Sequence, residues 1–164
     1  MKNKTTWLVA LAPLFLIVLF AGISSCHKPD DGPGAATQFS ATINGESFQP
    51  TTVLSKAANG LFVITGLMPK AADTFQLQLL FRDTINVRSK LTFKNDEAIL
   101  FYINIKGSPT YSSWAWYAHG EVTFTTVDKT NKKLAGNFNG VIYIHGAPAD
   151  SLVVKDGQFN ITYK

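Results

Sequence analysis

The chain has 164 residues, of which only 16% are charged, and its formal net charge is +4. Residues 26–164, the part predicted below to remain after processing, carry 13 basic and 11 acidic side chains, a net charge of +2 with the basic residues scattered. This pattern argues against nucleic-acid binding, since neutralising phosphates requires clustered basic side chains. The single cysteine, Cys26, excludes an intrachain disulfide and a zinc site built from four cysteines.

The N-terminal segment has the three-part layout of a secretory signal peptide. Lys2 and Lys4 precede an uncharged apolar run at residues 7–20, and small residues follow up to Cys26. The alternative is an uncleaved membrane-spanning helix, because the run nearly reaches the roughly 20 apolar residues that a span needs. Pro13 interrupts the run and no basic stop signal follows it. We therefore predict a signal peptide over residues 1–25.

The residues around Cys26 resemble a bacterial lipobox, because Ile23 is followed by two serines and the cysteine. In such signals the thiol is acylated, the chain is cut before the cysteine, and the new amine also takes an acyl group such as palmitate. The resemblance implies a lipid anchor at Cys26, and several acyl chains make attachment to a membrane stable.

Residues 26–37 are rich in Pro, Gly and Asp, and we expect them to form a flexible tether. This acidic tether is similar to that of surface-displayed lipoproteins of the Bacteroidetes. The similarity implies a cell-envelope protein of the outer membrane and leaves open which face of that membrane it occupies.

Residues 38–164 are expected to form a single all-β domain, because apolar and polar residues alternate in short runs. Asn44-Gly45, Asn59-Gly60 and Asp156-Gly157 are predicted two-residue turns, since these residue types tolerate positive φ. Polar loops are predicted at residues 128–133 and 145–150, and no window predicts a helix. The expected fold is an antiparallel meander, either a β-sandwich or a half-open barrel of about eight to ten strands, with a closed lipocalin-like barrel as the alternative.

Four short motifs add a resemblance that covers mainly the two ends of this domain. They are F-x-A-x-I-N-G-x-x-F at residues 39–48, G-x-V-T-F at 120–124, L-A-G-N-F-N at 134–139 and V-x-D-G-x-F-N at 154–160. Together with the lipobox and the tether, they resemble small lipoproteins of unknown function that are common in Bacteroidetes. The resemblance implies an architecture and a location, and it implies no activity.

No arrangement of residues predicts catalysis. A nucleophilic triad needs a histidine base beside a serine or cysteine, but Cys26 is assigned to the lipid and no G-x-S-x-G turn occurs. His119 and His145 each stand beside a glycine at a strand end, and we interpret them as solvent-facing turn residues. Acidic residues fall in the tether, in turns or at strand edges instead of in facing pairs. We predict no enzyme activity, no cofactor and no metal, with a hydrolase as the least favoured alternative.

The most concentrated chemical feature is the aromatic segment at residues 111–119. In an extended chain Trp114 and Trp116 share one face, and we predict a ligand platform there for a sugar ring or another flat apolar group. The alternative is a corner of the core, because tryptophan is usually largely buried. Tyr102 and Tyr143 are expected to extend an exposed aromatic patch. The predicted platform consists of Tyr111, Trp114, Trp116, Tyr117 and His119.

Two tripeptides, at residues 83–85 and 150–152, are similar to the O-glycosylation acceptor signal of secreted Bacteroidetes proteins. Thr84 and Ser151 are the candidate acceptors, in predicted loops, and ordinary turn chemistry is the alternative. For the whole chain we predict a lipid-anchored, non-enzymatic binding or accessory module for a glycan, a lipid or an envelope protein. The alternative function is a structural or interaction lipoprotein without a small ligand.

Overall fold

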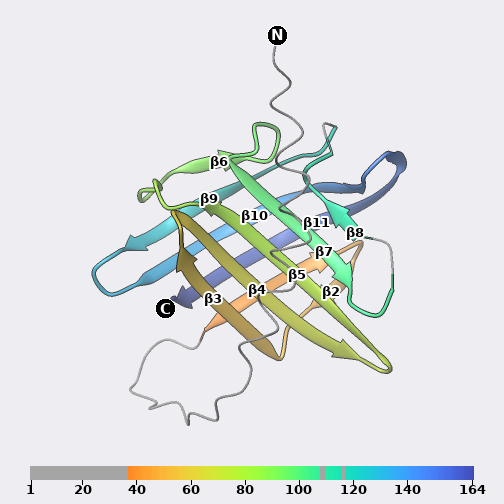
Figure 1. Ribbon diagram of the computed structural model, residues 1–164, viewed down its shortest axis with the longest axis horizontal. Coiled ribbons are helices and arrows are strands. Elements are labelled where there is room, and N and C mark those ends of the chain that lie inside the picture. Colours follow the sequence, from red (N-terminus) through yellow and green to blue (C-terminus); the bar gives the residue numbers. More distant parts are fainter. Residues whose placement is uncertain (1–36, 108–109, 116) are drawn as a thin grey trace. The chain divides into compact units, whose positions relative to one another are not determined.

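The computed structural model describes residues 37–164 with the exception of 108–109 and 116; the predicted lipidation site Cys26 lies outside these residues. The described residues belong to one compact unit, Ala35–Lys164. Within the described part of the chain, nothing helical has the length and apolar character that a membrane crossing requires. The strands (Figure 1) are β1 (Gln38–Ile43), β2 (Glu46–Phe48), β3 (Thr52–Ala58), β4 (Leu61–Lys70), β5 (Asp73–Arg82), β6 (Lys90–Thr92), β7 (Ala98–Asn104), β8 (Thr110–Ser112), β9 (His119–Asp128), β10 (Lys133–Ile144) and β11 (Ala147–Thr162).

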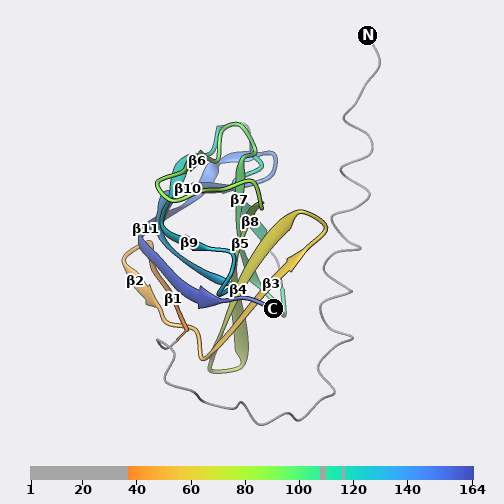
Figure 2. The ribbon, with the colours of Figure 1, turned by 90° about the vertical axis from the view of Figure 1, so that its left-hand side faces the viewer.

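All strands join one antiparallel sheet in the order β2-β1-β11-β10-β8-β7-β5-β4-β3, with β9 paired to β10 and β6 paired to β9. One edge of β10 is shared: its first part pairs with β9, and its last residues, Tyr143 and Ile144, pair with β8. The short strand β8 therefore links two halves. Figure 2 shows that β1, β2, β9, β10 and β11 lie on one side, facing β3, β4, β5 and β7 on the other.

The sheet does not close, because β2 and β3 stand at the two ends of the strand order and do not pair. Besides its pairing with β4, β3 contacts the end of the chain through hydrogen bonds from Ala57 N to Lys164 O (3.2 Å) and from Ser55 Oγ to Thr162 O (2.9 Å). The predicted all-β class, as a sandwich or half-open barrel, is confirmed. The alternative of a closed barrel is wrong.

The core lies between the two halves and is rich in phenylalanine rings. Phe81 of β5 contacts Phe124 of β9 edge to face, with ring centroids 4.9 Å apart, and lies 6.4 Å from Phe159 of β11. Phe124 and Phe159 also pack edge to face at 5.7 Å. All three rings are buried, so one aromatic cluster joins strands from both halves of the sheet.

Two of the predicted hairpin turns are confirmed. Asn44 and Gly45 have φ values of 48° and 84°, and Asn59 and Gly60 have 53° and 76°. Two consecutive residues with positive φ match the twist of the flanking strands. These turns close the β1–β2 and β3–β4 hairpins.

The third predicted turn, Asp156-Gly157, is wrong, because both residues lie inside the continuous 16-residue strand β11. They form a β-bulge there: between Phe138 and Gly140 of β10 the register advances by two residues, while β11 advances by three, from Gly157 to Val154. Asp156 takes the positive φ of 51° that the bulge requires. A Cβ on Gly157 would lie 2.5 Å from Phe138 Cδ2, so the ring occupies the place of the missing side chain.

The described residues form eleven strands, more than the predicted eight to ten, partly because β3 was not predicted. Its sequence TVLSKAA lacks a clean alternation of apolar and polar residues. The loop predicted at residues 145–150 is also wrong, since only His145 and Gly146 separate β10 from β11.

Candidate functional site

The aromatic segment does not form the extended strand that was predicted for it. Residues 113 and 114 lie in a turn after β8, and a second turn is closed by the hydrogen bond from Ala118 N to Ala115 O (2.7 Å). Ala115 and Ala118 are buried, so they hold this connection against the body of the domain. Trp116 lies outside the described residues.

Trp114 packs on the outside of the sheet. The residue is 37% exposed, and its indole stands nearly perpendicular to the Phe101 ring, with centroids 5.1 Å apart and an interplanar angle of 82°. Phe101 is half-buried, whereas its neighbour Leu100 is fully buried. Since side chains alternate between the faces of a strand, Phe101 and the Trp114 ring on it belong to the outer face of β7.

A second aromatic pair lies close by on the same face. Tyr117 and Tyr143 pack edge to face with centroids 4.6 Å apart, and the Tyr117 hydroxyl donates a hydrogen bond to Ile144 O at 3.3 Å. Ser112 lies opposite Tyr143 on one side and opposite Phe101 on the other. Phe101 on β7 and Tyr143 on β10 therefore lie in one row across β7, β8 and β10, and each carries one of the two pairs. We call the four rings the outer aromatic cluster: Phe101, Trp114, Tyr117 and Tyr143.

Tyr111 is separate from this cluster. Its hydroxyl donates a hydrogen bond to Asp150 Oδ1 at 2.9 Å. Burial raises the pKa of Tyr111, and the hydrogen bond to the Asp150 carboxylate and the negative charge of that carboxylate raise it further. This contact joins β8 to β11, so Tyr111 has a structural partner.

Tyr102 was predicted to extend the exposed aromatic patch, and this prediction is wrong. Its ring stacks on Phe75 at 5.8 Å and meets Phe48 edge to face at 6.2 Å, on the inner side of β7. Burial raises the pKa of Tyr102, with smaller contributions from the nearby Glu46 and Tyr111. Tyr143 does lie in the outer cluster.

Both histidines of the described residues, His119 and His145, are exposed at strand ends. His119 begins β9, with Nδ1 3.5 Å from the carbonyl oxygen of Tyr117. It also lines a shallow depression of about 510 Å³ on the outer side of β9, β10 and β11. His145 lies in the β10–β11 turn. Among the described residues, no three His, Cys, Asp or Glu side chains gather closely enough to hold a metal ion.

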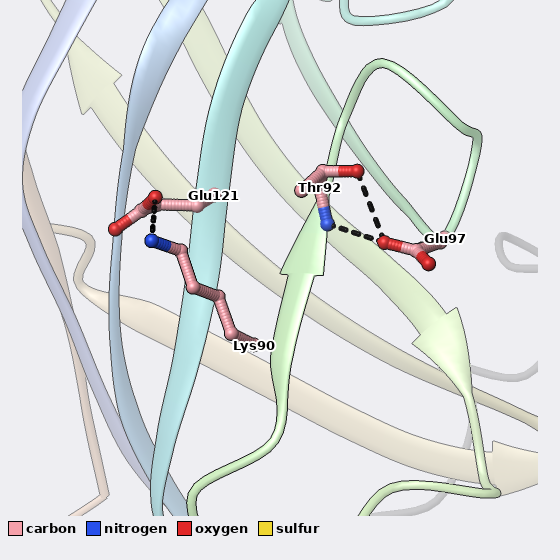
Figure 3. A network of polar contacts seen from close by, with 4 residues as sticks. All are labelled: Lys90, Thr92, Glu97 and Glu121. Carbon is pink, nitrogen blue, oxygen red and sulfur yellow. Dashed lines mark hydrogen bonds and ion pairs between the residues drawn. The ribbon is translucent and has the colours of Figure 1, made fainter.

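Several acidic side chains have structural partners. Glu121 forms an ion pair with Lys90 at 2.7 Å, which joins β9 to β6 (Figure 3). Glu97 accepts hydrogen bonds from Thr92 N at 2.8 Å and from Thr92 Oγ1 at 3.0 Å. On the surface, the hydrogen bond and positive charge of Lys70 lower the pKa of Glu46. These carboxylates fix strands and turns.

The two candidate glycosylation residues differ in their surroundings. Thr84 is exposed in the turn after β5, as predicted. Ser151 is half-buried within β11, opposite Tyr143, so its predicted position in a loop is wrong.

Sequence reasoning missed Phe101 as a member of the site. The run AILFY at residues 98–102 is apolar at every position, so no alternation shows which side chains face outward. Only the pairing with β5 and β8 assigns Phe101 to the outer face.

A comparison with protein-family models, with curated proteins and with solved structures gives no match for this chain.

The exposure of Trp114 leads to a prediction for the domain Ala35–Lys164. Iodide reaches only solvent-exposed indoles, so it should quench the tryptophan fluorescence of the wild-type domain. In the Trp116→Phe variant Trp114 is the one tryptophan left in residues 35–164, so its emission should still be quenched by iodide, with a clearly positive Stern–Volmer constant. The urea-unfolded variant serves as the control for full access. A constant near zero in the folded variant would show that Trp114 is shielded.

Proposed function

We propose that the protein is a lipid-anchored component of the bacterial cell envelope, tethered to the outer membrane through Cys26. The support is the uncharged apolar run at residues 7–20, the lipobox-like tetrad at residues 23–26 and the Pro-, Gly- and Asp-rich tether that follows. The folded unit that follows the tether has its own aromatic core.

We further propose that this unit is a non-enzymatic binding module and that the outer aromatic cluster is its contact site. The observation that carries the proposal is the position of Trp114, which stands 37% exposed on Phe101 instead of in the core. Aromatic rings with one exposed side are typical contact residues, because they combine a large apolar area with little loss of conformational entropy.

The contacts of the polar residues also support a binding function over catalysis. Tyr111, Asp150, Glu97 and Glu121 are engaged in contacts that join strands or close a turn. A general base must be within hydrogen-bond reach of the proton that it takes, and these groups are held by structural partners. A second function, that of a structural lipoprotein presenting a sheet face, is favoured by the apolar outer surface of β4, β5 and β7.

The anchor is tested by replacing Cys26 with serine in the expressing bacterium. The wild-type protein should sediment with membranes and show the mass of an acylated chain beginning at Cys26. The Cys26→Ser variant should lose the acyl mass and stay unprocessed or become soluble, because no thiol remains to accept lipid. An unacylated wild-type chain that retains Met1 would contradict the proposal.

The role of the cluster is tested with the unlipidated domain Ala35–Lys164 and washed cell envelopes of the same bacterium. The wild-type domain should co-sediment with the envelopes, and Trp114→Ala should weaken this binding by about tenfold, the effect of losing most of one buried aromatic contact. Ser47→Ala, at an exposed position on β2, is the matched control. Equal sedimentation of all three proteins would remove the cluster from the binding site.

A further inference from the structure

The half of the sheet formed by β3, β4, β5 and β7 carries apolar side chains on both of its faces. The register aligns Ile64, Leu79 and Leu100 on the inner face, where all three are buried. Both faces of a strand are apolar where both are covered. The outer rows of β4, β5 and β7 contain a matching set of half-buried side chains, which we call the outer apolar face: Val63, Leu67, Leu80, Ile99, Phe101 and Ile103.

The margin of this face is open to solvent. Leu54 on β3 and Ile105 after β7 are each 40% exposed, and the partly exposed Trp114 packs on Phe101 of the same face. Three polar residues lie among these rows. Gln78 Nε2 donates a hydrogen bond to Thr65 Oγ1 at 3.0 Å, and Gln76, between Leu67 and Ile103, is buried. A paired amide and hydroxyl cost little to remove from water, so the Gln78–Thr65 pair does not oppose covering the middle row.

The charges on this face are all of one sign. Lys56 on β3 lies opposite Val63, and Arg82 on β5 lies opposite Leu61, so both cations border the apolar rows at the same end. The outward positions of β3, β4, β5 and β7 within their described bounds include no aspartate or glutamate. An apolar centre with a cationic border and a tryptophan at its margin is the chemistry that suits an anionic lipid surface.

We infer that the outer apolar face lies against the surface of a lipid bilayer, with Lys56 and Arg82 toward anionic head groups and Trp114 at the interface. This inference rests on the proposed anchor: the chain from Cys26 to residue 37 can span about 40 Å at most, so the lipid keeps the domain close to the membrane. A second copy is a poorer occupant, since a twofold contact through this face would bring cation-bearing, acid-free surfaces together.

Vesicle sedimentation tests the inference with the unlipidated domain Ala35–Lys164, which contains the whole core. The wild-type domain should bind vesicles of phosphatidylcholine with about a quarter phosphatidylglycerol, and bind pure phosphatidylcholine more weakly. Leu54→Glu and Ile105→Glu should each weaken binding by about tenfold, because apolar contact is lost and a repelled charge is added. Lys56→Gln with Arg82→Gln should remove the preference for phosphatidylglycerol.

Val153→Glu is the matched control. Val153 is 38% exposed, but it lies on β11, in the half of the sheet opposite the outer apolar face. It should bind vesicles like the wild type. The inference is overturned if the wild-type domain ignores both vesicles, or if Val153→Glu and Leu54→Glu weaken binding equally. It is also overturned if light scattering shows a dimer that Leu54→Glu dissociates. None of these results bears on acylation of Cys26, which the fractionation experiment decides separately.

Discussion

Replacing Gly120 with alanine is expected to lower the free energy of unfolding by about 3 kcal/mol, which combines overpacking with an unfavourable backbone conformation. Gly120 has a φ of +144°, which residues with a Cβ rarely adopt. A Cβ there would lie 2.3 Å from Asn139 O and 2.5 Å from Gly140 Cα. Both are backbone atoms of β10, so relief requires the β9–β10 pairing to shift. Urea unfolding followed by circular dichroism measures the loss.

Gly107→Ala is the control for this substitution. No atom lies within 4 Å of a Cβ at Gly107, and its φ is not in the positive range. The variant should therefore stay within about 0.5 kcal/mol of the wild type. If Gly120→Ala had the same urea midpoint of unfolding as the wild type, β9 and β10 would not approach each other as closely at Gly120 as the structure shows.

Phe81→Ala should have the largest effect, a loss of about 3–5 kcal/mol in the free energy of unfolding, as for a fully buried aromatic side chain. The Phe81 ring contacts Phe62 at 5.5 Å within its own half of the sheet and reaches Phe124 and Phe159 in the other half. Its removal leaves a cavity between the halves that rigid strands on both sides cannot fill. Calorimetry or urea unfolding measures the loss.

Phe81→Leu separates a cavity from a general intolerance of change at this position. Leucine keeps most of the apolar volume, so we expect a loss of about 1.5 kcal/mol or less. A loss for Phe81→Ala that is no greater than that for Phe81→Leu would show that the two halves do not pack through this ring.

The sequence allows the all-β class and two of the three hairpin turns to be anticipated, and the failures have local causes. Asn44-Gly45 and Asn59-Gly60 form turns because each joins a strand at one end of the sheet, β2 or β3, to the strand that it pairs with. Asp156-Gly157 has the same chemistry but lies between β1 and β10, which both continue past it. An Asp-Gly pair suits a bulge as well as a turn, and only the neighbouring strands decide between them.

Two of the motifs behind the family resemblance have a packing explanation. Gly136 lies opposite Phe159, and Phe138 lies opposite Gly157, so each strand supplies a glycine for the ring of the other. A Cβ on Gly136 would lie 2.6 Å from Phe159 Cζ. Rings that cover cross-strand glycines fix the register of a sheet. The motifs at residues 134–139 and 154–160 thus describe how β10 and β11 fit together.

The candidate site was only partly predictable for a different reason. Trp114 was predicted as a site residue because aromatic residues are concentrated around it. Its orientation depends on the neighbouring turn, in which Ala115 and Ala118 are buried. The contribution of Phe101 depends on the register between β5, β7 and β8. Composition identifies such residues, whereas tertiary pairing determines which way they face.

The pairing of β1 with β11 affects when this protein can fold. Gln38, at the start of the domain, lies opposite Asn160 near its end, and β1 has no other neighbour besides the three-residue strand β2. Contacts between such distant parts of a chain form slowly, because a long loop must close first. The pairing of β1 with β11 can therefore form only after β11 has been synthesised. For the export that we propose, this means that the sheet stays incomplete until the whole domain has been synthesised.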